Sequence, residues 1–429
     1  MSKLAFITGM LALLLLQAPC STAEIQTLTI TSDTRPMILI EKFGFTGRGH
    51  VSISVSSVSV VAGTGSQPEP SRLGFFLLSE ESLLQVLIEM QQNPNFCVLD
   101  SHYTNHLFTF RCLSPPPASS FNHTYPLILP ARYSLFFANC NPESSVSMKL
   151  HTEFFTLNRD GSRNYLPSGH ALLPSLFFLF SILYFSFLAF WLYLCHVSNH
   201  SLLHRIHFLM PSLLLAKALS LLFAAAVKHH ANLTGISHAW DDVTFLVFDF
   251  VSVVLLFTVV VLVGTRWTFL HPLRQRGKTV LFFVVLPLQI LAHVAFVVVH
   301  NTGPYIQDWV TWNQILLLLD FISCCAVVFL FLWAIRLLRR ITSKAQSEPA
   351  MNLDRFRLIK RFYLVVLGYF LMTRFGVFVL RTIIAYEYEW VSNLAEETVT
   401  LVFCIVMFYM FRLVEKDEYS VLAEIVVNE

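Results

Sequence analysis

Charged residues are scarce in this sequence. Asp, Glu, Lys and Arg make up 13% of the 429 residues, whereas apolar residues make up 55%. Soluble globular proteins carry roughly 25% charged residues, and disordered chains combine low hydrophobicity with high net charge. The composition therefore excludes both classes for the chain as a whole. The formal net charge is only +2, so the chain is not the polycation that nucleic-acid binding favours.

Recognisable catalytic and metal-binding patterns are also missing. The sequence contains no HExxH, no GxSxG and no phosphate-binding loop, the patterns that supply zinc, nucleophile or phosphate chemistry. No CxxC pair supports zinc. One histidine cluster straddles a short connection, so it does not form one continuous ligand face; it consists of His196, His200, His204 and His207. We therefore predict no enzyme, no metal site and no cofactor.

The first residues have the features of a secretory signal peptide. Lys3 gives a positive start, residues 11–16 form an apolar core, and Ser21 and Ala23 are the small residues that precede a cleavage site. The apolar core is too short to span a bilayer comfortably. We predict that residues 1–23 are removed and that the mature chain begins outside the cytosol.

Residues 24–170 are more polar and show the alternation of strands. Residues 51–55 alternate apolar and polar side chains, and the alternation slips at Ser56 and Ser57, which predicts a β-bulge or turn. Ser79 can cap a short helix that ends at Asn93 and Pro94. Further strands are expected at 28–31, 38–43, 73–78, 107–112, 133–138 and 146–156. We predict an all-β, antiparallel sandwich with one helix.

Seven apolar stretches follow this domain. Each is about long enough to cross a hydrocarbon layer roughly 30 Å thick as a helix, the form that satisfies its own backbone in lipid. We therefore predict a membrane protein with a seven-transmembrane α-helical bundle over residues 171–412, surrounded by lipid, and a tail at 413–429. The spans are placed near 171–197, 203–228, 243–264, 279–300, 311–335, 358–383 and 392–412.

Basic residues give the orientation of these spans. Lys and Arg are concentrated at 265–278 and 336–361, and the opposite loops nearly lack them, which places these two loops in the cytosol. Residues 24–170 are then lumenal or extracellular, and the C-terminus is cytosolic. Asn122 and Asn232 stand in sequons on the glycosylated side, whereas Asn199 lies in a cytosolic loop. We predict glycan on the first two only.

Three cysteines fall in the oxidising compartment: Cys97, Cys112 and Cys140. Because the number is odd, at least one is free or pairs elsewhere. Any one pairing would cross-link a small β-domain, and the sequence pattern leaves all three pairings open.

Four local segments, taken in order, carry a resemblance to a known family. They are CVLD at 97–100, YSLFFANC at 133–140, RFRLIKRFY at 355–363 and EKDEYSVL at 415–422. With the order of signal peptide, β-rich domain, seven spans and short tail, they resemble the lung seven-transmembrane receptor family, or GOLD-domain seven-transmembrane proteins, of the plant candidate G-protein-coupled receptor type.

The resemblance implies a GOLD-like sandwich joined to a seven-helix bundle. It implies residence in the Golgi and endosomal system or at the plasma membrane, with a role in trafficking or signalling. It also implies a disulfide between Cys97 and Cys140, which leaves Cys112 unexplained. The family has no single agreed biochemical activity, so the fold alone does not settle the function.

Tyr419 and Leu422 form the first candidate functional motif. Tyr, two residues and a bulky apolar residue is the pattern that clathrin adaptors bind as an extended peptide, and a flexible tail close to the membrane suits that recognition. A pattern with two fixed positions also arises by chance, and we weigh the two interpretations equally.

Ionisable residues inside the predicted spans form the second candidate. Such residues are costly in lipid and usually face the bundle interior or a water-filled cavity. One interpretation is a polar cavity, open to the lumen, that holds a small ligand or ion. The other is structural pairing, for example of Asp249 or Asp320 with Lys217 or Arg374, which we rank slightly ahead. The candidate set is Lys217, Asp249, His293, Asp320, Arg374, Arg381, Glu396 and Glu397.

Seven spans with an external amino terminus are the geometry of G-protein-coupled receptors, although the Asp/Glu-Arg-Tyr and Asn-Pro-x-x-Tyr patterns are absent. We predict a receptor-like membrane protein of the Golgi, endosome and surface route. Its lumenal domain would bind an unidentified ligand or cargo, and its cytosolic side would engage a heterotrimeric G-protein α subunit or a clathrin adaptor. An ion channel or transporter that uses the intramembrane polar residues is the alternative, and no inverted repeat supports it.

Overall fold

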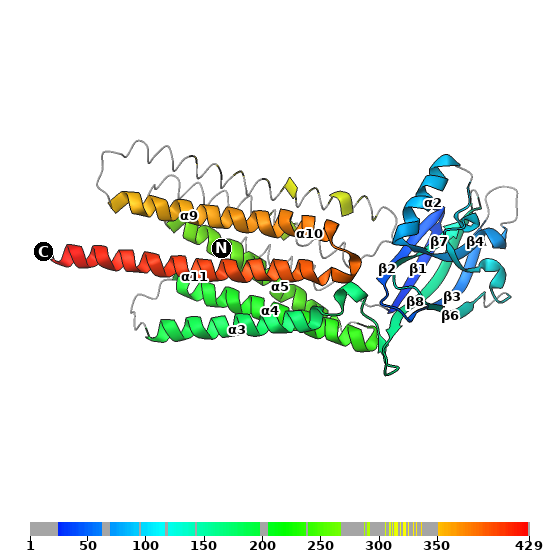
Figure 1. Ribbon diagram of the computed structural model, residues 1–429, viewed down its shortest axis with the longest axis horizontal. Coiled ribbons are helices and arrows are strands. Elements are labelled where there is room, and N and C mark those ends of the chain that lie inside the picture. The colour runs from blue at the N-terminus through cyan, green and yellow to red at the C-terminus, as the bar shows by residue number, and fades with distance from the viewer. Residues whose placement is uncertain are drawn as a thin grey trace. The chain divides into compact units, whose positions relative to one another are not determined.

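The structure is a computed structural model, and two units are recognised in it. It describes residues 25–61, 69–93, 96–115, 119–141, 144–197, 205–236, 239–266 and 351–427, with single positions between 287 and 336. The first unit consists of Met1–Pro174, Phe223–Thr244 and Val297–Asn313, and the second of Ser175–Leu222, Phe245–Phe296 and Gln314–Glu429. Figure 1 shows the strands of the first unit and the long helices of the chain.

The strands of the first unit form a sandwich of two antiparallel sheets (Figure 1). One sheet has the order β1 (Ile25–Asp33), β8 (Ser145–Leu157), β3 (Gly49–Val61) and β6 (Phe121–Leu127), with β9 (Arg163–Asn164) paired to β8. The other has the order β2 (Met37–Gly44), β7 (Arg132–Asn139), β4 (Leu73–Ser79) and β5 (Asn105–Thr109). The predicted all-β sandwich is confirmed.

Alternate side chains of β3 build the core between the sheets. Val51, Ile53 and Val55 are fully buried and pack in one apolar cluster with Phe75 and Phe137 of the second sheet. Full burial of a side chain of this size contributes about 1.5–3 kcal/mol. The alternation of apolar and polar residues in the sequence therefore correctly predicts which face of β3 packs against the core.

The slip in that alternation is a bulge, as predicted. The register between β3 and β8 shifts between Ser56 and Ser59, and Ser57 adopts a φ of 54°, a conformation that few non-glycine residues take. Beyond the bulge, Val58 and Val60 are only partly buried at the edge of the core.

The predicted helix is α2 (Glu80–Gln92), and it covers the outer face of the second sheet. The Ser79 hydroxyl accepts a hydrogen bond from the Ser82 backbone N–H at 3.3 Å, which satisfies one of the free donors at the helix start. Val86 is buried in a second apolar cluster with Phe76 and Phe136. The capping and the end of this helix at Gln92 agree with the sequence analysis.

Two strand predictions were wrong in detail. The strand expected at 107–112 begins earlier and ends at Thr109, and Phe110–Cys112 form a turn of 3-10 helix. Strand β6 was not predicted, because three successive polar residues, 122–124, and Pro126 interrupt its apolar alternation. Proline is tolerated there since β6 lies at the edge of its sheet and needs no donor on that side.

Five described stretches are long and apolar enough to cross a membrane: Ser168–His196, Phe208–Thr234, Trp240–Val260, Lys360–Ile383 and Tyr386–Met410. They correspond to the predicted first, second, third, sixth and seventh spans. Most residues of the predicted spans 279–300 and 311–335 lie outside the described residues. The helices are α3 (Leu173–Val197), α4 (Arg205–Thr234), α5 (Ala239–Arg266), α9 (Met351–Leu371), α10 (Val377–Ile383) and α11 (Trp390–Val427).

The last helix corrects the expectation of a flexible tail. Helix α11 does not end near residue 412 but continues to Val427, so Tyr419 and Leu422 lie within a helical segment. The residues after 412 include neither glycine nor proline, the residues that most strongly end a helix. An adaptor that binds the motif as an extended peptide would have to unwind the end of α11.

Candidate functional site

A buried ion pair joins two helices of the second unit. The Lys217 ammonium group of α4 lies 2.9 Å from the Glu397 Oε1 atom of α11, and the two side chains are 18% and 9% exposed. A charge in an apolar environment is costly unless it is paired. The arrangement is the structural pairing weighed in the sequence analysis. Glu397 is the hydrogen-bonded partner of Lys217, and Asp249 also lies close enough to interact with the ammonium group.

Two more polar groups surround this pair. Ser220, one turn along α4, donates a hydrogen bond of 3.4 Å to Asp249 Oδ1 on α5. Tyr184 of α3 is fully buried in an apolar cluster with Leu214 and Cys404, near the two charged residues. Four helices thus contribute polar side chains to one part of the unit, which we call the α4–α11 polar cluster: Tyr184, Lys217, Ser220, Asp249 and Glu397.

Two oxygens of this cluster keep hydrogen-bonding capacity. Among the described residues, Glu397 Oε2 and Tyr184 Oη are buried and make no hydrogen bond. Leaving such a group unsatisfied costs about 1–3 kcal/mol. The two oxygens are the features of the cluster that fit a small polar guest best.

The remaining predicted residues differ in where the structure places them. Arg381 and Glu396 form a separate pair at 3.3 Å, with side chains 56% and 42% exposed. Arg374 lies in a π-helical segment, Met372–Gly376, between α9 and α10. His293 and Asp320 lie outside the described residues. Tyr184 and Ser220 were missed, because an aromatic or hydroxyl side chain within an apolar stretch gives no distinctive sequence signal.

The sandwich is hydrogen-bonded to the end of α4 within the first unit. The Ile25 N–H at the start of β1 donates to the Gly235 carbonyl at 3.0 Å, and the Tyr165 N–H after β9 donates to the Asn232 carbonyl at 3.3 Å. Gly235 has a φ of +71°, and a Cβ atom added there would lie 2.7 Å from the Ile25 side chain. A glycine at this position allows both the helix end and the close approach of β1.

A substitution at Gly235 is therefore expected to loosen this junction. Gly235→Ala should destabilise the protein by about 1–3 kcal/mol, since it adds both backbone strain and a steric conflict. Gly161→Ala is the matched control, because Gly161 also has a positive φ (+81°) but no atom within 4 Å of an added Cβ. Thermal unfolding of both variants separates the two effects, and equal destabilisation would refute a role of the contact with Ile25.

Arg35 makes a second connection within the first unit. Its guanidinium group pairs with Asp33 at 2.6 Å and donates to the Tyr305 carbonyl. Burial opposes ionisation of the Asp33 carboxyl, but the hydrogen bonds from Arg35 outweigh it and hold its pKa below the usual value. A lowered pKa stabilises the fold at neutral pH, and this contribution is lost as the pH falls through the pKa of the folded state.

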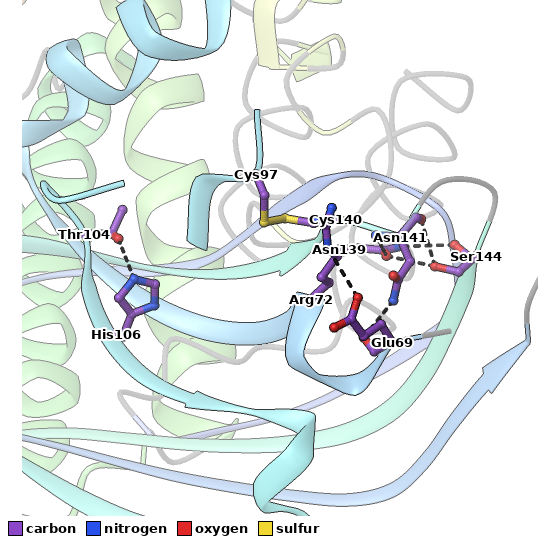
Figure 2. Close-up of a disulfide and its surroundings, with 9 residues drawn as sticks. All are labelled: Glu69, Arg72, Cys97, Thr104, His106, Asn139, Cys140, Asn141 and Ser144. Carbon is purple, nitrogen blue, oxygen red and sulfur yellow. Dashed lines mark hydrogen bonds and ion pairs between the residues drawn. A yellow bond between two sulfur atoms is a disulfide. The ribbon is translucent and has the colours of Figure 1, made fainter. Parts of the chain in front are cut away.

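A disulfide links the residue after β7 to the segment after α2. Cys97 and Cys140 are joined, with Cα atoms 5.5 Å apart (Figure 2). Beside it, the Asn139 amide donates to the Ser144 carbonyl at 2.9 Å and its Oδ1 atom accepts from the Ser144 hydroxyl at 2.8 Å. Cys112 is an exposed free thiol. This pairing is the one that the family resemblance implied.

The sequons at Asn122 and Asn232 differ in their surroundings. Asn122 is exposed in the edge strand β6, whereas Asn232 is half-buried in the last turn of α4, with its Oδ1 atom buried. We expect high glycan occupancy at Asn122 and lower occupancy at Asn232. Glycosidase treatment of wild type, Asn122→Gln and Asn232→Gln, followed by mass spectrometry, measures both. Glycan at Asn199, which lies outside the described residues, would overturn the predicted topology.

Comparison with known proteins agrees with this architecture. The family model described as CAND6/7, N-terminal domain, matches residues 26–156, a range that runs from β1 into β8 of the sandwich. A protein of Arabidopsis thaliana named Candidate G-protein coupled receptor 6 is 50% identical over 421 residues, which cover 98% of this chain and 96% of that protein. The sandwich, the apolar helices and this similarity over almost the full length show that the chain belongs to the plant candidate G-protein-coupled receptor family.

Proposed function

We propose that this chain is a receptor-like membrane protein whose β-sandwich binds a ligand or cargo outside the cytosol and whose helices transmit that event. The observation that carries the proposal is the attachment of the sandwich to α4. Ile25 and Tyr165 bond to the last turn of α4 and the residue after it, so a change in the sandwich acts on a helix that is long enough to cross the membrane.

Helix α4 has a defined partner along its length. Lys217, on the same helix, is paired with Glu397 of α11, and α11 continues to Val427. A ligand shifts a conformational equilibrium only by its differential affinity for two states. The Lys217–Glu397 pair can distinguish two such conformations, because the ion pair is formed in one of them and broken in the other.

Two features support a lumenal or extracellular sandwich. The Cys97–Cys140 disulfide is of a kind that persists in oxidising compartments and is rare in the cytosol. The sandwich also directly follows the predicted signal peptide. The Golgi and endosomal system or the plasma membrane, with the C-terminus in the cytosol, is the location we propose.

Nucleotide exchange tests the signalling part of the proposal. Full-length protein in nanodiscs is expected to accelerate exchange on a heterotrimeric G-protein α subunit. Neutralising Arg336, Arg339 and Arg340 in the basic segment 336–361 should abolish the acceleration, whereas Arg381→Gln, at the exposed pair with Glu396, should not. An exchange rate equal to that of empty nanodiscs would reject direct G-protein coupling.

Steady-state location tests the trafficking part. If Tyr419 and Leu422 are a sorting signal for a clathrin adaptor, wild type should reside in the Golgi and endosomes, and Tyr419→Ala should move to the surface. Ser420→Ala is the matched control, since it changes the same helical segment outside the two fixed positions. The same distribution for all three proteins would mean that the motif arose by chance.

A channel or transporter is the second candidate function. The observation in its favour is the pair of buried oxygens, Glu397 Oε2 and Tyr184 Oη, that make no hydrogen bond within the described part of the chain. Ion flux in liposomes that contain the purified protein, reduced in Asp249→Asn, would promote this candidate. Absence of flux in wild type would reject it.

A further inference from the structure

Helix α2 has a second apolar stripe that the sandwich does not cover. Leu84, Leu87 and Ile88 are 66%, 43% and 45% exposed, and their spacing of three and four residues places them on one face of the helix. The opposite face contributes Val86 to the apolar cluster over the second sheet. An amphipathic surface helix normally has one apolar face, which packs on the core. Packing on the sandwich therefore does not account for the exposed stripe.

The helix holds this stripe on a fixed support. Ser79 caps its first turn. Near its end, the Ser101 hydroxyl donates to Glu89 Oε2 at 2.6 Å and accepts from the Tyr103 N–H at 3.3 Å. Tyr103 is 46% exposed, so an aromatic side chain lies in the segment bonded to α2. Preformed apolar anchors with an aromatic residue nearby are the features that concentrate binding energy in interfaces.

The charged residues of α2 are all acidic. Glu80 and Glu81 are exposed one turn before Leu84, Gln91 and Gln92 follow Ile88, and the sequence of α2 contains no Lys or Arg. A partner that covers the leucines therefore gains by placing basic side chains beside the two glutamates. A second copy of the chain would bring the same glutamates with its own α2, and a membrane with anionic lipids would repel them.

We propose that the outward stripe of α2, formed by Leu84, Leu87 and Ile88, docks an amphipathic helical segment of another protein that has an apolar face and basic flanking residues. Helix-on-helix packing suits anchors spaced by three and four residues. The inference rests on the proposed function, because it names the part of the sandwich that receives the ligand or cargo and the chemistry of what is received.

Fluorescence anisotropy tests the docking surface directly. The full-length protein in neutral-lipid nanodiscs is titrated against a labelled synthetic helix with a leucine face and lysine flanks. Binding that is at least about tenfold weaker in a Leu84→Gln, Leu87→Gln, Ile88→Gln variant, and that falls as salt is raised, is expected. Ile128→Gln with Leu129→Gln is the matched control, since these exposed apolar residues (87% and 68%) lie in the same domain but outside α2, and should bind as wild type does.

A second probe isolates charge. A peptide with the same leucine face and glutamate flanks should bind at least about tenfold more weakly to wild type, and Glu80→Lys with Glu81→Lys should reverse the preference. Equal binding of the basic peptide to the α2 variant and to wild type would overturn the proposal, as would binding to empty nanodiscs at the same strength. A smaller molecular mass of the α2 variant by light scattering would assign the stripe to a second copy instead.

The peptide-binding result can be distinguished from the results of the exchange and location experiments that test the proposed function. If the α2 variant loses peptide binding but G-protein exchange and location are unchanged, the stripe is a docking surface that serves neither process, and the link between them is refuted. If exchange and sorting are both absent in wild type while peptide binding depends on the stripe, the proposed function fails and the docking surface stands.

Discussion

Lys217→Met is expected to destabilise the helical unit by about 3–5 kcal/mol, because it leaves the Glu397 carboxylate buried without its partner. The two side chains are 18% and 9% exposed, so solvent can compensate only in small part for the lost ammonium group. Unfolding of the purified protein in mild detergent, followed by circular dichroism, measures the loss. Glu397→Leu alone should be similarly damaging, since it leaves the ammonium group unpaired.

The double variant Lys217→Met, Glu397→Leu is expected to recover most of this stability, because apolar replacement of a whole buried pair is often neutral. Arg381→Met, at the more exposed pair with Glu396, is the control and should lower stability by less than Lys217→Met does. Additive losses in the double variant would show that the two side chains do not interact. A double variant that is stable but no longer activates exchange would identify the pair as part of signal transmission.

Loss of the Cys97–Cys140 disulfide is the second large effect. Cys97→Ser or Cys140→Ser should lower the stability of the sandwich by about 2–5 kcal/mol, the range for native disulfides in small extracellular domains. The bond closes a loop with a sequence separation of 43 residues, and Cys97 is buried against the outer apolar cluster of the second sheet. Limited proteolysis of residues 25–170 within the full-length protein reports the change.

Cys112→Ser provides the control for this experiment. Cys112 is an exposed free thiol, so its replacement is expected to leave protease resistance within error of wild type. Mass spectrometry of peptides from the unreduced protein should find Cys97 and Cys140 linked. Destabilisation by Cys112→Ser equal to that of the other two variants would mean that the disulfide exchanges among the three cysteines.

Local signals made the strands, the bulge and the helix cap predictable. The alternation around Val51 reflects a strand with one buried face, and the slip at Ser56 appears because one extra residue reverses that face. Ser79 accepts a hydrogen bond from a backbone N–H in the first turn of α2, so its role as a helix cap can be predicted from adjacent residues. Five of the predicted spans were recovered for the same reason, because hydropathy is a property of a continuous segment.

Contacts between distant segments were not predictable in the same way. Lys217 and Glu397 are 180 residues apart, and their meeting depends on how α4 and α11 pack, which no local pattern encodes. The sequence analysis named Asp249 as a possible partner of Lys217, and Asp249 does lie close enough to interact with it, but the direct ion pair is with Glu397. Likewise the cysteine pattern left three pairings open, and only the family resemblance singled out Cys97 and Cys140.

For strand β6 the local sequence favours a loop, whereas contacts with the rest of the sandwich stabilise a strand. Phe121 and Tyr125 pack against the core on one side, while the other side is solvated and Pro126 breaks the pattern. Pairing with β3 outweighs the weak local preference. The helical end of α11 was not predicted, because hydropathy marks only the membrane-crossing part of a helix, whereas a polar segment without glycine or proline can continue it to Val427.

The edge strands of the sandwich have a consequence for aggregation. Strands β1 and β2 change register between Ile30 and Asp33 and between Leu39 and Glu41, and the short β5 shifts against β4. The fourth edge strand, β6, contains Pro126. Irregular edges are poor templates for the addition of a further strand from another chain. We therefore expect the sandwich to resist edge-to-edge aggregation with other copies while it folds. Binding partners are then expected to contact the faces of the sheets or helix α2 rather than the strand edges.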